Sequence, residues 1–211
     1  MRPRLTLLLV ATTAGLACSE RTLGTERAAG LIADLDGFKR AAYFTIHTGV
    51  PLRLAFTCLS QTEVERAPLN QFAVGQGWVR YETREANFGL GGKAPCPAMA
   101  STPRGETASA TWTRGRVPSD EGVAWIVSIG RRELLGVREL SEAPDGSTHV
   151  EFEWKWTPND TGTALRKAVT SANAFFGQTR TGRATCRQRD DGWQCQLRMW
   201  APADALGEFR P

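Results

Sequence analysis

The sequence predicts an α+β fold, in which a helix-rich N-terminal part precedes an antiparallel β-sheet with one packed helix and a disulfide-bonded hairpin. Three observations lead to this prediction. Apolar residues recur at helical spacing in residues 25–41, residues 150–156 alternate strictly between apolar and charged, and two cysteines near the C-terminus face each other across a short loop. The 211 residues allow one sizeable domain or two small ones that share a core.

The N-terminal part is expected over residues 25–105 and begins with a helix and a short strand. The helix spans residues 25–41, and its apolar stripe consists of Ala28, Leu31, Ile32, Leu35 and Phe38. A strand over residues 42–47 follows, because Gly49 and Pro51 end the extended pattern.

A second helix is expected after Ser60, since Ser60 and Glu63 have the spacing of a capping box. Pro68 then limits or splits this helix. Residues 78–82 predict a strand, and the Gly- and Pro-rich residues 85–105 predict a long loop. The helix–helix–strand order of residues 25–83 is also compatible with a winged-helix-like module.

The C-terminal part, residues 106–211, is expected to be rich in antiparallel strands. Strand candidates cover residues 108–113, 123–130, 133–142 and 148–157. The last of these is the clearest half-buried strand, with one face made by Val150, Phe152, Trp154 and Trp156. A helix over residues 162–176 follows and is expected to stop at Gly177.

The cysteines predict a disulfide framework. If Cys18 is set aside, four remain, an even number that allows three pairings. Cys186–Cys195 is preferred because a four-residue loop over residues 189–192 places these cysteines opposite each other. The same register puts Ala184 opposite Leu197, so that one mainly apolar face results. Cys58–Cys96 is then the second pair, and spacing argues against a metal site.

The first eighteen residues have the pattern of an export signal. Arg2 and Arg4 precede an apolar run over residues 5–17, which is too short to span a bilayer as a helix. Gly15, Leu16 and Ala17 then lead into Cys18, with Gly15 in the place usually held by leucine. This segment resembles a bacterial lipoprotein signal with its lipobox.

The lipobox resemblance implies that Cys18 receives a diacylglyceryl group and becomes the acylated N-terminus, with residues 18–24 as a tether. Plain secretion and an uncleaved buried helix remain alternatives. Ser19 follows the cysteine, which favours the outer membrane, on its periplasmic face, in a Gram-negative host. Residues 123–200 also resemble uncharacterised small bacterial envelope proteins. The shared features are the Phe152–Pro158 strand, the helix after it and the Asp190–Trp193 hairpin. This resemblance implies no activity.

The charge does not predict a nucleic-acid partner. The formal charge of +4 includes Arg2 and Arg4; without residues 1–17, 24 basic and 22 acidic residues remain. The arginines are spread along the sequence, whereas a nucleic-acid partner calls for a basic stripe.

The residue pattern shows no catalytic motif, and no cofactor is expected. His47 and His149 are the only histidines, and neither lies in a recognised nucleophile motif; Ser128 also lacks the Gly-x-Ser-x-Gly elbow. The paired carboxylates Glu151 and Glu153 are interpreted as a solvated strand face. Most of the seven tryptophans are expected in the core; Trp200 is the candidate for a binding surface, because the register places it opposite the disulfide face.

The first of three functional hypotheses is a membrane-anchored, non-enzymatic envelope lipoprotein that binds a protein, polymer or lipid partner through its β-rich half. A continuous aromatic surface would favour it. The second is an exported hydrolase with a site assembled from distant residues, which a pocket containing His149 or Glu151 with a strongly shifted pKa would favour. The third, a cytosolic DNA-binding winged helix, conflicts with the signal and the cysteines.

Overall fold

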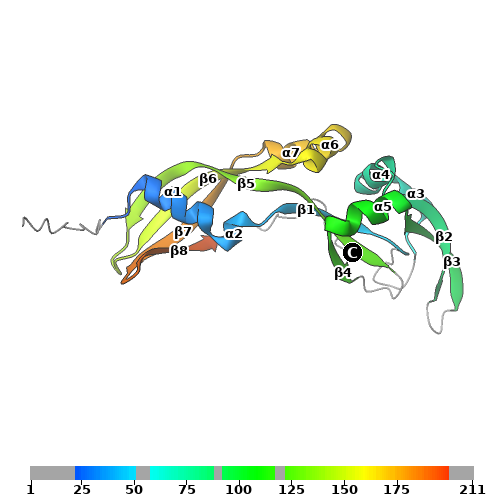
Figure 1. The fold of residues 1–211 in the computed structure, drawn as a ribbon, viewed down its shortest axis with the longest axis horizontal. Helices are drawn as coiled ribbons and strands as arrows, with labels where there is room; N and C mark the ends of the chain where they lie inside the picture. The colour runs from blue at the N-terminus through cyan, green and yellow to red at the C-terminus, as the bar shows by residue number, and fades with distance from the viewer. Residues whose placement is uncertain (1–21, 51–57, 88–91, 117–121, 200–211) are drawn as a thin grey trace, which may run out of the picture.

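The structure has two antiparallel sheets and several short helices, which agrees with the predicted α+β class (Figure 1). The computed structural model describes residues 22–50, 58–87, 92–116 and 122–199. Its strands are β1 (Ala42–His47), β2 (Val79–Asn87), β3 (Lys93–Ser101), β4 (Thr113–Arg116), β5 (Val123–Glu142), β6 (Thr148–Pro158), β7 (Arg180–Arg189) and β8 (Gly192–Met199). The larger sheet has the order β1-β5-β6-β7-β8, with β4 also paired to β5, and β2 and β3 form a separate hairpin.

The helices are short and lie at several places along the sheets. They are α1 (Thr25–Asp34), α2 (Asp36–Lys39), α3 (Gln61–Arg66), α4 (Pro68–Gly75), α5 (Pro103–Ala108), a 3₁₀ turn (Ser109–Thr111), α6 (Asp160–Ala168) and α7 (Thr170–Gly177). α1 contacts both β5 and β8 and therefore covers one face of the β5–β8 sheet, while α6 and α7 pack on β5 and β6. In Figure 1, α3, α4 and the β2–β3 hairpin gather at the opposite end of the molecule from α1.

The 20-residue strand β5 connects these two ends. Its first part pairs with β1 and β4, and residues 130–142 pair with β6. The two strands predicted over residues 123–130 and 133–142 are therefore one strand. Its register shifts twice, between Leu134 and Gly136 and between Val137 and Glu139. Such bulges increase local twist, so the sheet can bend around α1.

The predicted alternation in β6 is confirmed. Val150, Phe152, Trp154 and Trp156 are at most 2% exposed, whereas the intervening charged residues are half-buried. Phe152 and Trp154 meet the Phe38 ring edge-on, and Trp156 stacks on Phe175 of α7 at a centroid distance of 5.7 Å. One strand face thus joins the helices of both chain halves into a single core.

Both long helices that the sequence predicts are broken. The helix predicted over residues 25–41 is interrupted by Leu35, which has extended backbone angles, so that Phe38 reaches the core after the bend. The helix predicted over residues 162–176 begins earlier, at Asp160, and is interrupted by the extended, buried Val169. The apolar spacing continues through both breaks, although the helix does not. The side chains before and after each break pack into the same core.

The predicted long loop over residues 85–105 is wrong, because most of it forms β2, β3 and α5. The N–H and C=O groups of Met99 in β3 both form hydrogen bonds with Gly49, on the side of β3 opposite β2. The odd-numbered residues of β3 therefore direct their N–H and C=O groups away from β2. Pro95 and Pro97 share this parity, so their missing N–H groups do not interrupt the β2–β3 ladder. Prolines that seem to exclude a strand in sequence are thus accommodated on its outer edge.

The region around residue 105 contains a short helix that the sequence pattern did not predict. The boundary expected after residue 105 falls within α5, and the strand predicted over residues 108–113 is the end of α5 and a 3₁₀ turn, with β4 beginning at Thr113. A winged-helix arrangement receives no support, since β1 pairs with β5 of the larger sheet. The strand predicted over residues 42–47 and the split at Pro68 are confirmed.

Candidate functional site

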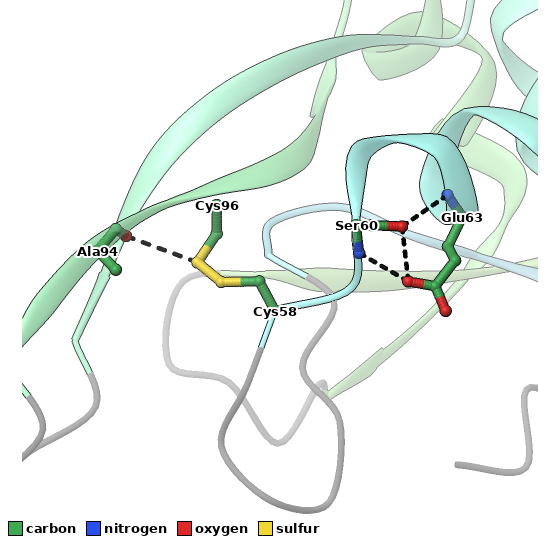
Figure 2. The surroundings of a disulfide bond; sticks show 5 residues. All are labelled: Cys58, Ser60, Glu63, Ala94 and Cys96. Atoms are coloured by element: carbon green, nitrogen blue, oxygen red, sulfur yellow. Dashed lines mark hydrogen bonds between the residues drawn. A yellow bond between two sulfur atoms is a disulfide. The ribbon is translucent and has the colours of Figure 1, made fainter.

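Both predicted disulfides are present in the structure. Cys58–Cys96 joins the segment before α3 to β3 (Figure 2). Beside it, the predicted capping box forms: the Glu63 N–H donates to Ser60 Oγ at 3.3 Å, and the Ser60 N–H donates to Glu63 Oε2 at 2.8 Å. This disulfide fixes the start of α3 against the projecting hairpin.

The second disulfide, Cys186–Cys195, lies across β7 and β8, whose register is the predicted one, with Ala184 opposite Leu197. The connecting loop is shorter than predicted, because Arg189 still pairs with Gly192. Gly192 has φ 117°, a left-handed angle that favours glycine at this turn. The hairpin therefore presents a fixed alternation of inward apolar and outward polar side chains.

The outward polar residues form a surface that we call the outer face, the side of β5–β8 opposite the buried residues of β6. A hollow of about 600 Å³, the first hollow, lies on it. Cross-strand pairing explains its composition: Glu139 lies opposite Glu151, and Ser141 lies opposite His149. The lining residues are Glu139, Ser141, His149, Val150, Glu151, Arg183, Ala184, Thr185 and Arg198.

Two polar contacts order the first hollow. His149 Nδ1 lies 3.2 Å from Thr185 Oγ1, and the Arg183 guanidinium approaches Glu151 Oε2 at 3.2 Å through both Nε and a terminal nitrogen. Thr185 is only 7% exposed, so its hydroxyl forms the floor of the hollow. The hollow thus carries charged side chains of both signs.

A second hollow of about 420 Å³ continues along β7 and β8 and shares Thr185 and Arg198 with the first. Its lining residues are Thr185, Arg187, Arg189, Gln194, Cys195, Gln196 and Arg198. Arg187 contacts Asp145 at 2.6 Å. Hydrogen bonds from the Ser147 hydroxyl and N–H, with Arg187 as a further cause, lower the pKa of Asp145 to about 2.

A third hollow, of about 350 Å³, lies between α3 and the β2–β3 hairpin. The Tyr81 hydroxyl donates to the Glu65 carbonyl at 3.2 Å, and burial together with the Glu65 charge raises the pKa of Tyr81. His47 lies in β1 opposite Ala124, where burial lowers its pKa. Neither residue forms part of the outer face.

The tryptophans of the described residues are mainly core residues, as expected. Trp78, Trp125, Trp154, Trp156 and Trp193 are at most 8% exposed, and Leu135 is the only large hydrophobic side chain in the described ranges that is exposed. The guanidinium of Arg132 lies over Trp156, 4.6 Å from its ring centroid, and that of Arg180 over Trp154, 5.5 Å from its ring centroid. The described surface thus contains no continuous aromatic patch.

The remaining predicted site residues, Cys18 and Trp200, lie outside the described residues. Within the described ranges, no three His, Cys, Asp or Glu side chains cluster as metal ligands, and no helix is long and apolar enough to cross a membrane. Comparison of the chain with protein-family models, curated proteins and solved structures gives no significant match.

Sequence reasoning missed the outer-face hollows as sites. The alternation of the β7–β8 hairpin does assign Arg183, Arg187 and Arg198 to its outward side, so part of the signal is in the sequence. Glu139 and Ser141 could not be assigned, because two bulges in β5 change the register against β6. The position of the hollows follows from that register.

Proposed function

We propose that the protein is a membrane-anchored, non-enzymatic envelope lipoprotein that binds its partner through the outer face of β5–β8. The observation that supports binding on this face is the continuous pair of hollows along β6, β7 and β8. The signal pattern ending at Cys18 and the two disulfides support an exported, anchored protein, because disulfides persist in oxidising compartments.

The proposed anchor at Cys18 would hold the folded part close to the membrane. Leu23 is 6% exposed and belongs to the core, so only residues 19–22 separate it from Cys18. An extended chain covers about 3.3–3.6 Å per residue, so Leu23 would lie within about 18 Å of the acylated cysteine. Two or three acyl chains bury enough methylene groups for lasting attachment.

The geometry of the first hollow favours binding over catalysis. β6 is paired on both sides, with β5 and β7, so its backbone N–H groups are engaged in ladders instead of forming an oxyanion hole. His149 and Glu151 are alternate residues of one strand, which separates their positions by about 7 Å. Glu151 is paired with Arg183 and does not orient the imidazole.

An exported hydrolase remains the second candidate, because His149 and Glu151 do line one hollow. In that case His149 would act as the base for the Thr185 hydroxyl, 3.2 Å from its ring. A covalent adduct on Thr185 after treatment with a broad fluorophosphonate probe, absent in the H149A variant, would support this alternative. A lack of labelling agrees with the binding role.

The test of the proposed anchor is the intact mass of the protein purified from native envelopes, before and after reduction and thiol labelling. We expect a chain that begins at Cys18, carries acyl mass, and exposes four thiols only after reduction. The C18S variant is expected to lose the acyl mass and the membrane fraction while keeping both disulfides. A wild-type chain that retains residues 1–17, or has free thiols before reduction, would contradict the proposal.

A further inference from the structure

Arginine side chains gather on the β7–β8 part of the outer face, although they are dispersed in sequence. Arg187 and Arg189 are alternate residues of β7, and Arg198 lies on β8. All three are exposed and line the second hollow, together with the side chains of Thr185, Gln194 and Gln196. Among the described residues, no acidic side chain lines this hollow. The lining side chains therefore carry a net positive charge from three arginines, while the Gln194 amide already donates to the Asp191 carboxylate.

These arginines differ in how far their charge is already compensated. Arg187 has Asp145 as an ion-pair partner at 2.6 Å. Arg189 and Arg198 have no ion-pair partner within the part of the chain that the structure describes. Two guanidiniums without an ion-pair partner, beside the Gln196 side chain, favour a phosphate group, which arginine binds through paired, charge-assisted hydrogen bonds.

The second hollow begins at the end of the molecule from which the proposed tether leaves. The turn of the β7–β8 hairpin and the start of α1 lie together at one end of the molecule (Figure 1). Gly192 in that turn is close to Arg27 in the first turn of α1: an added Cβ would lie 3.8 Å from a terminal nitrogen of Arg27. Leu23, two residues before α1, is fixed in the core at the same end.

We propose that the second hollow binds the phosphate of acidic phospholipid headgroups in the membrane that holds the anchor. This inference rests on the proposed function, since the short tether is what brings Arg189 within reach of the headgroups. Positive side chains near an acidic surface strengthen its attachment, and they would orient the folded part on the membrane. A lipid headgroup is favoured over single-stranded nucleic acid because, among the residues that the structure describes, no aromatic side chain lines this hollow to stack on a base.

The test compares the full chain reconstituted into vesicles of phosphatidylcholine alone with vesicles containing about one third phosphatidylglycerol. Phenylglyoxal modifies accessible arginines, and peptide masses give the rate at each position. We expect modification of Arg189 and Arg198 to slow at least about fivefold in the acidic vesicles, and this protection to weaken with added salt. The exposed Arg40 and Arg66, on other surfaces, should change less than about twofold.

A charge-matched pair of variants tests the surface as a unit. In R189Q/R198Q, the protection of Arg187 by acidic vesicles should be lost. In R40Q/R66Q, which removes the same charge elsewhere, the protection should remain. Circular dichroism checks that both variants fold.

Several results would overturn the inference. Equal protection in neutral vesicles, uniform protection of all arginines, or loss of protection in both variants would each exclude a specific headgroup surface. The same protection by inorganic phosphate or by an oligothymidylate would indicate a free anion or a nucleic acid as the ligand. The intact mass of the chain tests separately whether Cys18 is acylated, so a missing anchor can be distinguished from a missing headgroup surface.

Discussion

Removal of the Cys58–Cys96 disulfide should destabilise the protein more than removal of Cys186–Cys195. The reason is the length of chain that each closes: the sequence separations are 38 and 9 residues. Loop-closure entropy assigns them about 4 and about 2.6 kcal/mol respectively. The packing loss should nearly cancel in this comparison, because each pair joins one fully buried cysteine, Cys96 or Cys186, to a half-buried one.

The assay is urea unfolding of the wild type and of the double variants C58A/C96A and C186A/C195A, followed by tryptophan fluorescence. Five buried tryptophans give a strong signal on unfolding. We expect C58A/C96A to be less stable than C186A/C195A by about 1.3 kcal/mol. Equal losses, or a larger loss in C186A/C195A, would refute the loop-entropy reasoning and indicate that local strain or packing dominates.

Two further predictions concern pH and packing. Asp145 has its pKa lowered from 3.8 to about 2 by hydrogen bonds from Ser147, so its contribution to stability is present above about pH 4 and is lost as the pH falls toward 2. Urea unfolding between these pH values should show a smaller loss of stability for D145N than for the wild type; equal slopes would contradict this. G162A should destabilise by about 1–3 kcal/mol or more, because an added Cβ would lie 1.9 Å from the Ile129 carbonyl oxygen. The matched change G30A lies at an exposed helix position where an added Cβ meets nothing within 4 Å, so it should raise the urea midpoint and stabilise the protein by about 0.5–1 kcal/mol. Destabilisation by G30A would show that the space around the added Cβ does not decide whether a Gly→Ala change stabilises the protein.

Local chemistry made several elements predictable. The capping box at Ser60 needs only residues three apart, and it forms as the sequence indicates. The alternation in β6 runs over residues 148–157, and every residue on one side of that stretch is buried. The hairpin register was fixed by two independent requirements, the pairing of Cys186 with Cys195 and the burial of Ala184.

Other elements depended on partners that are distant in sequence. β3 contains two prolines that argue against a strand, and only the outward direction of their nitrogens makes the β2–β3 hairpin possible. The breaks at Leu35 and Val169 leave the apolar periodicity intact, so the sequence pattern alone cannot locate them. Both errors have the same cause: tertiary packing decides between backbone conformations that suit the local pattern equally well.

The sequence by itself determined the α+β class, the two cysteine pairings and the inward face of the strand carrying Trp154, because each depends on local periodicity or on short-range pairing. Only the tertiary structure decided that β1 joins a strand about eighty residues later in the chain, and that the outer face is hollowed. It also brought Arg189 and Arg198 together, although arginines that are dispersed along a sequence give no sign of a surface. Pairing register and sheet twist determine which outward side chains become neighbours, and both arise from contacts across the whole fold.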